Sequence, residues 1–303
     1  MNAIGKSSVV FVTLSGLFWG GWVLGSQTPE GQEALARAYE AYAQQQATAN
    51  EDLFNSTALR AVVCGDASTE RGQAQPCLAI VAAGRMFIVD AGSGAAANLN
   101  GSNMPMDRLG AVLLTSAGLT QTADLDELYG ATARATGNAL LPVYGPADTQ
   151  RMVDGLNQAA GFDGMERGLQ AWGPSPEPGQ SVIVFEADGL VVSAFTTQED
   201  AFNGRIGYRF DYRGRSIVVG GDGRVADAPA ARNADVVLQS SIGAEGRDAD
   251  AGLVMLTGAD NEMAGRIQVA EARAAGVDNV TAARLGMLVE LPLENMDINV
   301  RPL

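Results

Sequence analysis

The sequence predicts an α/β domain in which two mixed β-sheets are sandwiched between outer helices. Short apolar or alternating segments, which are typical of strands, recur from residue 59 to residue 303. Segments with helical periodicity stand between them, so the order of elements fits a layered sandwich. The 303 residues are 47% hydrophobic, which is enough to bury one large core, and 37 glycines suit many tight turns.

The first half of the domain is predicted to begin with an antiparallel hairpin whose turn is Ala83-Gly84. A helix is predicted to start beside Asp124 and Asp126, whose negative charges favour a helix N-terminus. The region 161–179 contains three prolines and is predicted to be a long loop. The predicted strands are 61–63, 78–81, 86–89, 111–115 and 142–144, and the predicted helices are 94–99, 125–135 and 148–160.

The second half returns to strands and ends in mixed α and β segments. The predicted strands are 182–186, 190–196, 206–212, 216–220, 236–238, 253–256, 279–282 and 288–291, and the predicted helices are 225–232 and 261–275.

Residues 1–26 are predicted to be a membrane anchor or a signal segment. Lys6 precedes the uncharged apolar stretch 9–24, and Glu30 and Glu33 follow it, which predicts an inner-membrane location with the main domain exported to the periplasm. The stretch is at the short limit of a membrane-spanning helix and also fits a cleaved signal peptide, although a retained anchor is favoured. Residues 27–58 are predicted to be a helical spacer, and residues 59–303 the globular domain.

The most informative motif follows the apolar run 109–114. It reads Thr115-Ser116-Ala117-Gly118-Leu119-Thr120-Gln121, with Asp124-Leu125 and Leu128 shortly after it. This pattern resembles the metal loop of the metallo-β-lactamase superfamily, in which a strand ends in Thr-His-x-His-x-Asp-His. The resemblance extends over residues 61–292 and is to the ribonuclease Z-like and arylsulfatase-like branch. It implies a four-layer αββα sandwich.

The resemblance also implies that nearly every metal ligand has been replaced, in a chain that contains no histidine. Asp222 matches the bridging aspartate and is the one ligand kept. At the other positions the family ligand is replaced. Ser116, Gly118, Thr120 and Gln121 stand at the positions of His, His, Asp and His in the metal loop. Glu199 stands at the position of the third His of the first site, Gln239 at that of a further His, and Gly258 at that of the last His. Zinc is expected in relatives, but its preferred ligands are absent here, so we expect no zinc cofactor. A hard cation held by Glu199 and Asp222 is the alternative.

Charge argues against nucleic acid as substrate or partner. The formal net charge is -15 and the pI is about 4.4, whereas binding to a polyanion normally rests on clustered Lys and Arg. Cys64 and Cys77, the only cysteines, are predicted either to form a disulfide in an exported domain or to be two small buried side chains.

Two catalytic or cofactor motifs are weak. Residues 92–97 match a Gly-x-Gly-x-x-Ala dinucleotide fingerprint, but the preceding hairpin makes the strand antiparallel, and a nucleotide fold requires a parallel βαβ unit. A serine nucleophile lacks the histidine that an ordinary triad needs.

These observations predict a pseudoenzyme with a binding or scaffolding role at the membrane, whose partner is an unknown protein or small molecule. The alternative is a residual hydrolase of phosphodiester, sulfate or lactone esters, as the resemblance implies.

Overall fold

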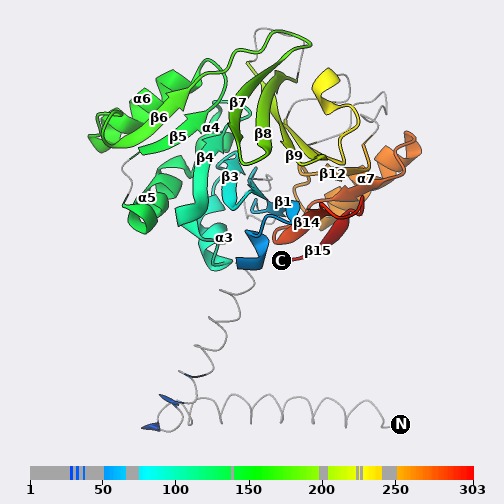
Figure 1. Ribbon diagram of the computed structural model, residues 1–303, viewed down its shortest axis with the longest axis horizontal. Coiled ribbons are helices and arrows are strands. Elements are labelled where there is room, and N and C mark those ends of the chain that lie inside the picture. Colours follow the sequence, from blue (N-terminus) through cyan, green and yellow to red (C-terminus); the bar gives the residue numbers. More distant parts are fainter. Residues whose placement is uncertain are drawn as a thin grey trace, which may run out of the picture. The chain divides into compact units, whose positions relative to one another are not determined.

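The computed structural model describes residues 28–29, 32–33, 37, 51–65, 75–137, 140–197, 204–222, 225, 228–240 and 251–303 (Figure 1). The chain divides into two compact units, Met1–Asp52 and Leu53–Leu303. In the first unit, Arg37 and Glu33 form an exposed ion pair of 3.1 Å. No helix among the described residues is long and apolar enough to span a membrane, and the predicted anchor lies outside them.

The second unit contains two mixed β-sheets. The first sheet has the strand order β15-β14-β1-β2-β3-β4-β5-β6, and the second sheet has the order β13-β12-β11-β10-β9-β8-β7. The strands of the first sheet are β1 (Ala58–Val63), β2 (Leu78–Ala82), β3 (Arg85–Val89), β4 (Leu109–Leu113), β5 (Leu140–Tyr144), β6 (Gly168–Trp172), β14 (Met287–Pro292) and β15 (Asn299–Pro302). Those of the second are β7 (Ser181–Ala187), β8 (Leu190–Thr196), β9 (Ile206–Tyr212), β10 (Arg215–Gly221), β11 (Val236–Gln239), β12 (Leu253–Leu256) and β13 (Val280–Ala282).

The main core lies between the two sheets. Successive side chains of a strand point to opposite faces, so Leu59, Ala61 and Val63 of β1 join this core while Val62 packs on the outer side. The second sheet contributes large side chains to the same layer, among them Tyr208 and Phe210 of β9. Both faces of central strands such as β1, β2 and β10 are therefore buried, which explains their near-continuous apolar sequences.

Helices cover the two outer faces of this sandwich, as predicted (Figure 1). The outer face of the first sheet carries α3 (Ala95–Gly101), α5 (Leu125–Thr136) and α6 (Thr149–Ala160). The outer face of the second sheet carries α7 (Glu262–Ala274) and the short 3-10 turn η2 (Pro229–Ala231). The remaining short elements are η1 (Met106–Arg108) and α4 (Leu119–Thr122).

Three two-residue hairpins set the register of the antiparallel strands. Their turns are Ala83-Gly84, Asp188-Gly189 and Arg213-Gly214, and both residues of each turn have positive φ. Turns of this kind match the twist of the flanking strands, and glycine adopts the second position without strain.

Several predictions of local structure were wrong. The region 161–179 is not a continuous loop, because β6 lies within it and pairs in parallel with β5. Strand β15 was missed at the other edge of the first sheet. The predicted helix 225–232 is reduced, among its described residues, to η2, since Pro229 lies at the beginning of that turn and the chain is extended again at Arg232.

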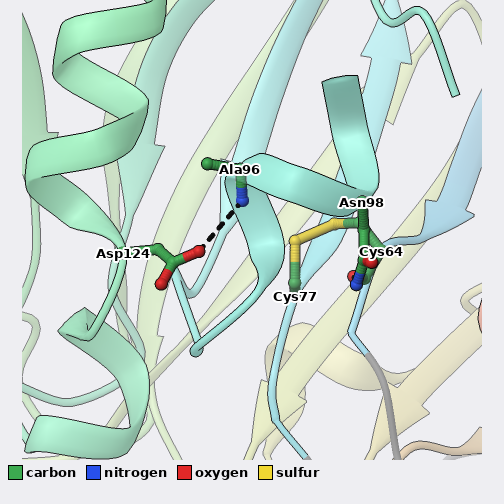
Figure 2. The surroundings of a disulfide bond; sticks show 5 residues. All are labelled: Cys64, Cys77, Ala96, Asn98 and Asp124. Carbon is green, nitrogen blue, oxygen red and sulfur yellow. Dashed lines mark hydrogen bonds between the residues drawn. A yellow bond between two sulfur atoms is a disulfide. The ribbon is translucent and has the colours of Figure 1, made fainter. Parts of the chain in front are cut away.

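A disulfide joins Cys64, just after β1, to Cys77, just before β2 (Figure 2). Their Cα atoms are 4.9 Å apart, and the Asn98 side chain of α3 donates a 2.8 Å hydrogen bond to the Cys64 carbonyl. Asp124 lies at the N-terminus of α5 as predicted, and Figure 2 shows that its side chain also accepts a 3.1 Å bond from the Ala96 amide of α3. The carboxylate therefore caps the neighbouring helix.

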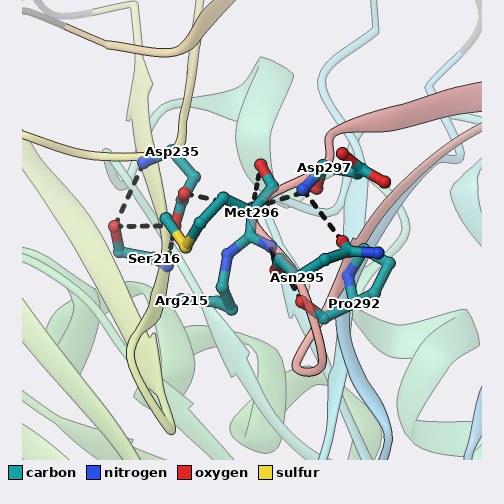
Figure 3. Close-up of polar contacts among 7 residues, drawn as sticks. All are labelled: Arg215, Ser216, Asp235, Pro292, Asn295, Met296 and Asp297. Carbon is teal, nitrogen blue, oxygen red and sulfur yellow. Dashed lines mark hydrogen bonds and ion pairs between the residues drawn. The ribbon is translucent and has the colours of Figure 1, made fainter.

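Buried Arg215 ties the end of the first sheet to the second (Figure 3). Its guanidinium donates to the carbonyls of Pro292, Asn295 and Asp297 at 2.8, 2.7 and 3.0 Å, and pairs with Asp235 at 3.1 Å. Because a guanidinium offers five donors in a fixed plane, a single side chain organises the whole loop after β14.

Candidate functional site

The candidate site lies where strands of both sheets end. Parallel pairing of β3 with β4 and of β10, β11 and β12 with one another brings their carboxyl ends to common edges. Ligand sites of open α/β sheets are usually built on loops at such edges. Here the edges carry Asp90 after β3, the motif 115–121 after β4, Asp222 after β10 and Gly258 after β12.

A chain of side-chain hydrogen bonds connects the loop after β4 to the end of β10. The Gln121 amide donates to Asp222 Oδ2 at 2.8 Å, and Ser116 Oγ lies 3.1 Å from Gln121 Oε1. The Gly118 amide donates to Ser116 Oγ at 3.2 Å. Gln121 is buried, so its amide is placed by these partners rather than by water. The structure thus brings Ser116, Gly118, Gln121 and Asp222 together.

Two glycines in this region leave no room for a side chain. A Cβ at Gly118 would lie 2.8 Å from Gln121 Oε1 and 3.2 Å from Ser116 Oγ, so a residue there would displace the glutamine. A Cβ at Gly258 would meet the backbone carbonyl of Ser240 far inside van der Waals contact. The Gly258 amide also donates to that carbonyl at 3.2 Å. Side chains at 118 and 258 would therefore collide with neighbouring atoms in this arrangement of the loops.

Asp90 is the most perturbed acid of the site. It is 2% exposed and has a φ of 59°, a conformation that few non-glycine residues adopt. Thr115 donates to both of its oxygens, from the amide at 2.7 Å and from Oγ1 at 2.8 Å. The pKa of the Asp90 carboxyl is raised to about 7: burial is the main cause, the two Thr115 bonds oppose it, and the charge of Asp222 adds a smaller raising effect.

A small pocket with both polar and apolar walls lies between these strand ends. Its volume is about 80 Å³, well below the roughly 300 Å³ at which pockets for drug-sized ligands begin. Three of the predicted site residues line it: Thr120, Asp222 and Gly258. Asp90, Ser240 and Thr257 add further polar groups. The pocket suits a small hydrogen-bonding ligand.

Among the described residues, four predicted positions lie outside the pocket lining: Ser116, Gly118, Gln121 and Gln239. Glu199 lies outside the described residues. Gln239 ends β11 and is 4% exposed, and its Oε1 has no hydrogen-bond partner among the described residues. It is therefore buried beside the site and takes no part in the Ser116–Gln121–Asp222 chain.

The structure adds contacts that the sequence did not identify. Asp90 and Thr115 clamp the ends of β3 and β4 together, and Arg205 Nη1 donates to the Asp222 carbonyl at 3.2 Å. The Tyr208 hydroxyl donates to the Leu114 carbonyl at 3.0 Å, across the two sheets. An acid directly after a buried apolar strand was a usable signal for Asp90, because buried carboxyls need specific partners.

The dinucleotide-like segment after β3 needs one correction. We expected β3 to be antiparallel to its neighbour. It is antiparallel to β2, but it also pairs in parallel with β4, and α3 lies between β3 and β4 in the chain. Two contacts occupy the space that a pyrophosphate uses in such folds. The Asp124 carboxylate caps Ala96 at the N-terminus of α3, and Pro76 lies against Gly92, where an added Cβ would be 2.7 Å from the Pro76 carbonyl.

Comparisons with known proteins agree with the resemblance of the motifs. No protein-family model matches the chain. A ribonuclease Z of Mycobacterium marinum is 29% identical over 159 residues, which cover 50% of this chain and 57% of that protein. The chain thus matches little more than half the length of this relative.

Solved structures match over more of the chain. The metallo-β-lactamase fold protein YhfI from Bacillus subtilis has a TM-score of 0.59 at 19% identity, covering 77% of this chain and 99% of that one. The short form of human tRNase Z has a TM-score of 0.55 at 15% identity, with the same two coverages. Zinc-bound PqqB from Methylobacterium extorquens has a TM-score of 0.53 at 14% identity, covering 76% and 99%. The chain therefore has the metallo-β-lactamase fold, and its relatives include ribonuclease Z.

Proposed function

We propose that this protein is a non-catalytic member of the metallo-β-lactamase fold, with a binding or scaffolding role. The observation that carries the proposal is the hydrogen-bond chain from Ser116 through Gln121 to Asp222. It joins two loops that, by the resemblance of the motifs, would otherwise be joined by metal ions. The side chains hold the loops directly, so the fold has a metal-independent means of fixing this edge.

The residues present do not fit the zinc ions that the fold implies. Zinc is held by imidazole nitrogen, thiolate or carboxylate. The sequence has no histidine, and its two cysteines, Cys64 and Cys77, are bonded to each other. In the described ranges no group of three or more His, Cys, Asp or Glu is placed to share a metal ion. One oxygen of Asp222 already accepts the Gln121 amide. We therefore derive no catalytic step through a metal.

A binding role is supported by the pocket that remains. Asp90, Thr120, Ser240 and Thr257 contribute polar groups to the lining of a small pocket whose other walls are largely apolar, and the disulfide residue Cys77 forms part of its wall. A small polar ligand would be held by hydroxyl and carboxyl groups there. We further propose that residues 1–26 hold the protein at the membrane with the domain exported. Recovery of the full chain in the soluble fraction of cells would contradict the retained anchor.

The competing function is a residual hydrolase of phosphodiester, sulfate or lactone esters. One observation favours it: Asp90 lines the pocket and has a pKa near neutral pH, as a general acid or base requires. Against it, both carboxyl oxygens of Asp90 are engaged by Thr115, and the side chain is buried.

Turnover of generic aryl esters separates the two functions. The purified full chain is incubated with bis(p-nitrophenyl) phosphate, p-nitrophenyl sulfate and an aryl lactone, with and without chelator. We expect rates equal to the buffer blank. The matched variants are Asp222→Ala and, as control, Asp154→Ala on the exposed side of α6. Turnover that survives purification, disappears in Asp222→Ala and persists in Asp154→Ala would establish the hydrolase.

A further inference from the structure

α7 is the least buried of the longer helices on the sandwich. Of its thirteen residues only Gly265 and Ala272 are buried, whereas α5 buries five residues of a similar length. Met263 and Ile267, one helical turn apart, are 65% and 51% exposed. An outer helix normally buries a continuous apolar stripe, so α7 leaves an unusual share of its surface exposed. Met263 and Ile267 lie outside the lining of the groove beside this helix.

A long groove runs beside this helix. It lies between α7 and residues 280–287, which comprise β13 and the segment leading into β14, and its volume is about 710 Å³. Its floor is apolar and is formed by residues such as Val269, Val280 and Met287, with Leu285 46% exposed at the margin. This volume lies within the roughly 300–1,000 Å³ of ligand-binding clefts, and is far larger than that of the pocket at the strand ends.

The rim of the groove is positively charged in a protein whose net charge is -15. Three arginines line it, Arg266, Arg273 and Arg284, against one acid, Glu262. Arg266 and Arg284 both contact the same Glu262 oxygen, at 2.8 and 3.3 Å. Arg273 forms no ion pair within the described part of the chain. One carboxylate cannot satisfy the donors of three guanidiniums, so the rim retains unused positive charge.

The positive charge of these arginines affects the carboxyl group that lines the groove. The hydrogen bond from Arg266, together with the charges of Arg266 and Arg284, lowers the pKa of the Glu262 carboxyl. A second carboxylate brought to the rim would meet the same favourable field. Guanidinium groups bind carboxylates in a paired geometry, and arginine is enriched at protein interfaces.

We infer that this groove docks a segment of a partner protein that carries carboxylates beside apolar side chains. The apolar side chains would cover the floor near Val269, and the carboxylates would pair with Arg266, Arg273 and Arg284. An amphipathic segment laid in a groove is a common mode of peptide recognition. The inference does not depend on the state of the metal loops, so its failure would leave the proposed loss of zinc binding intact.

A peptide-selection experiment tests the inference. A random 16-residue display library is selected against the purified full chain at about 50 mM salt. We expect the enriched peptides to combine Asp or Glu with Leu, Ile, Val or Phe, and to bind at least ten times more weakly to an Arg266→Glu/Arg273→Glu variant. The matched control is Arg151→Glu, since Arg151 is an exposed arginine on α6 outside the groove. It should bind the peptides as the parent does.

Three results would overturn the inference. The first is a library that yields no enriched peptide, and the second is enrichment without an excess of acidic residues. The third is binding that the groove variant retains in full, with its fold verified by circular dichroism. An Arg266→Gln/Arg273→Gln variant separates loss of charge from reversal of charge, and should weaken binding by a smaller factor than the glutamate variant. Self-association that the groove variant abolishes, without peptide enrichment, would instead assign the groove to a second copy of the chain.

Discussion

Replacing Asp90 by asparagine should change how the stability of the domain depends on pH. Asparagine keeps the shape of the side chain and an oxygen that can accept the Thr115 amide, but it cannot ionise. Burial raises the pKa of Asp90 from 3.8 to about 7. The folded state therefore holds a proton that the unfolded chain releases near pH 4, and this favours the folded state only at low pH. The stabilisation is complete below the unfolded pKa and is lost as the pH rises through about 7.

The size of the effect follows from the two pKa values. Each pH unit between them corresponds to about 1.4 kcal/mol, so the whole stabilisation of the protonated form is about 4 kcal/mol. Between pH 5 and pH 8 the free energy of unfolding of the parent should fall by about 3 kcal/mol relative to that of Asp90→Asn. Comparison of the two proteins removes the contribution of the other titrating groups that they share.

The assay is urea unfolding of the parent, Asp90→Asn and the control Asp154→Asn at pH 5, 6, 7 and 8. Asp154 is exposed on α6, so its replacement should leave the pH dependence of the parent unchanged. A difference between parent and Asp90→Asn that stays constant from pH 5 to pH 8 would refute the reasoning. It would show that Asp90 ionises in the folded protein as it does in water.

Three further substitutions test the contacts that hold the site and the fold, each by urea unfolding. Gln121→Ala should lower the free energy of unfolding by about 1–3 kcal/mol, because it leaves buried polar partners unpaired, whereas Thr120→Ala at the exposed neighbouring position should stay within about 0.5 kcal/mol. Equal losses in the two variants would show that the Gln121 bonds do not contribute. Replacing Cys64 and Cys77 together by serine should cost about 2–4 kcal/mol, and a parent whose free energy of unfolding is unchanged by reductant would argue against the disulfide. Arg215→Met should cost about 3–5 kcal/mol, because it removes the ion-pair partner of Asp235 and the donors to the loop after β14, and a neutral result would contradict the role given to this arginine.

Most of the strands could be predicted because the central ones are buried on both faces and apolar throughout. The edges were harder. β6 has the sequence Gly-Leu-Gln-Ala-Trp and β15 has Asn-Val-Arg-Pro, which carry little apolar periodicity because β6 is buried only in part and β15 is exposed. β6 and β15 form because their backbones pair with the neighbouring strands β5 and β14. Such backbone pairing leaves no local signal in the amino-acid sequence.

The candidate site could be located from the sequence but not described in detail. The motif after β4 and Asp222 after β10 are far apart in the chain, and the resemblance to a known family brought them together. The Gln121–Asp222 hydrogen bond could not be predicted, because it depends on two loops approaching from different sheets. The sequence shows Asp90 directly after an apolar strand, which is a signal for a buried acid. The raised pKa of its carboxyl depends on burial of the side chain by both sheets.

The zinc content of the purified full chain tests the central claim most directly. The protein is incubated with excess zinc at pH 7.5, passed through a desalting column and analysed by inductively coupled plasma mass spectrometry, with calorimetric titration of the same sample. We expect less than about 0.1 zinc per chain and no saturable heat, because imidazole and free thiolate ligands are missing from the site. One or two ions retained per chain would mean that this edge of the sandwich still holds a metal centre.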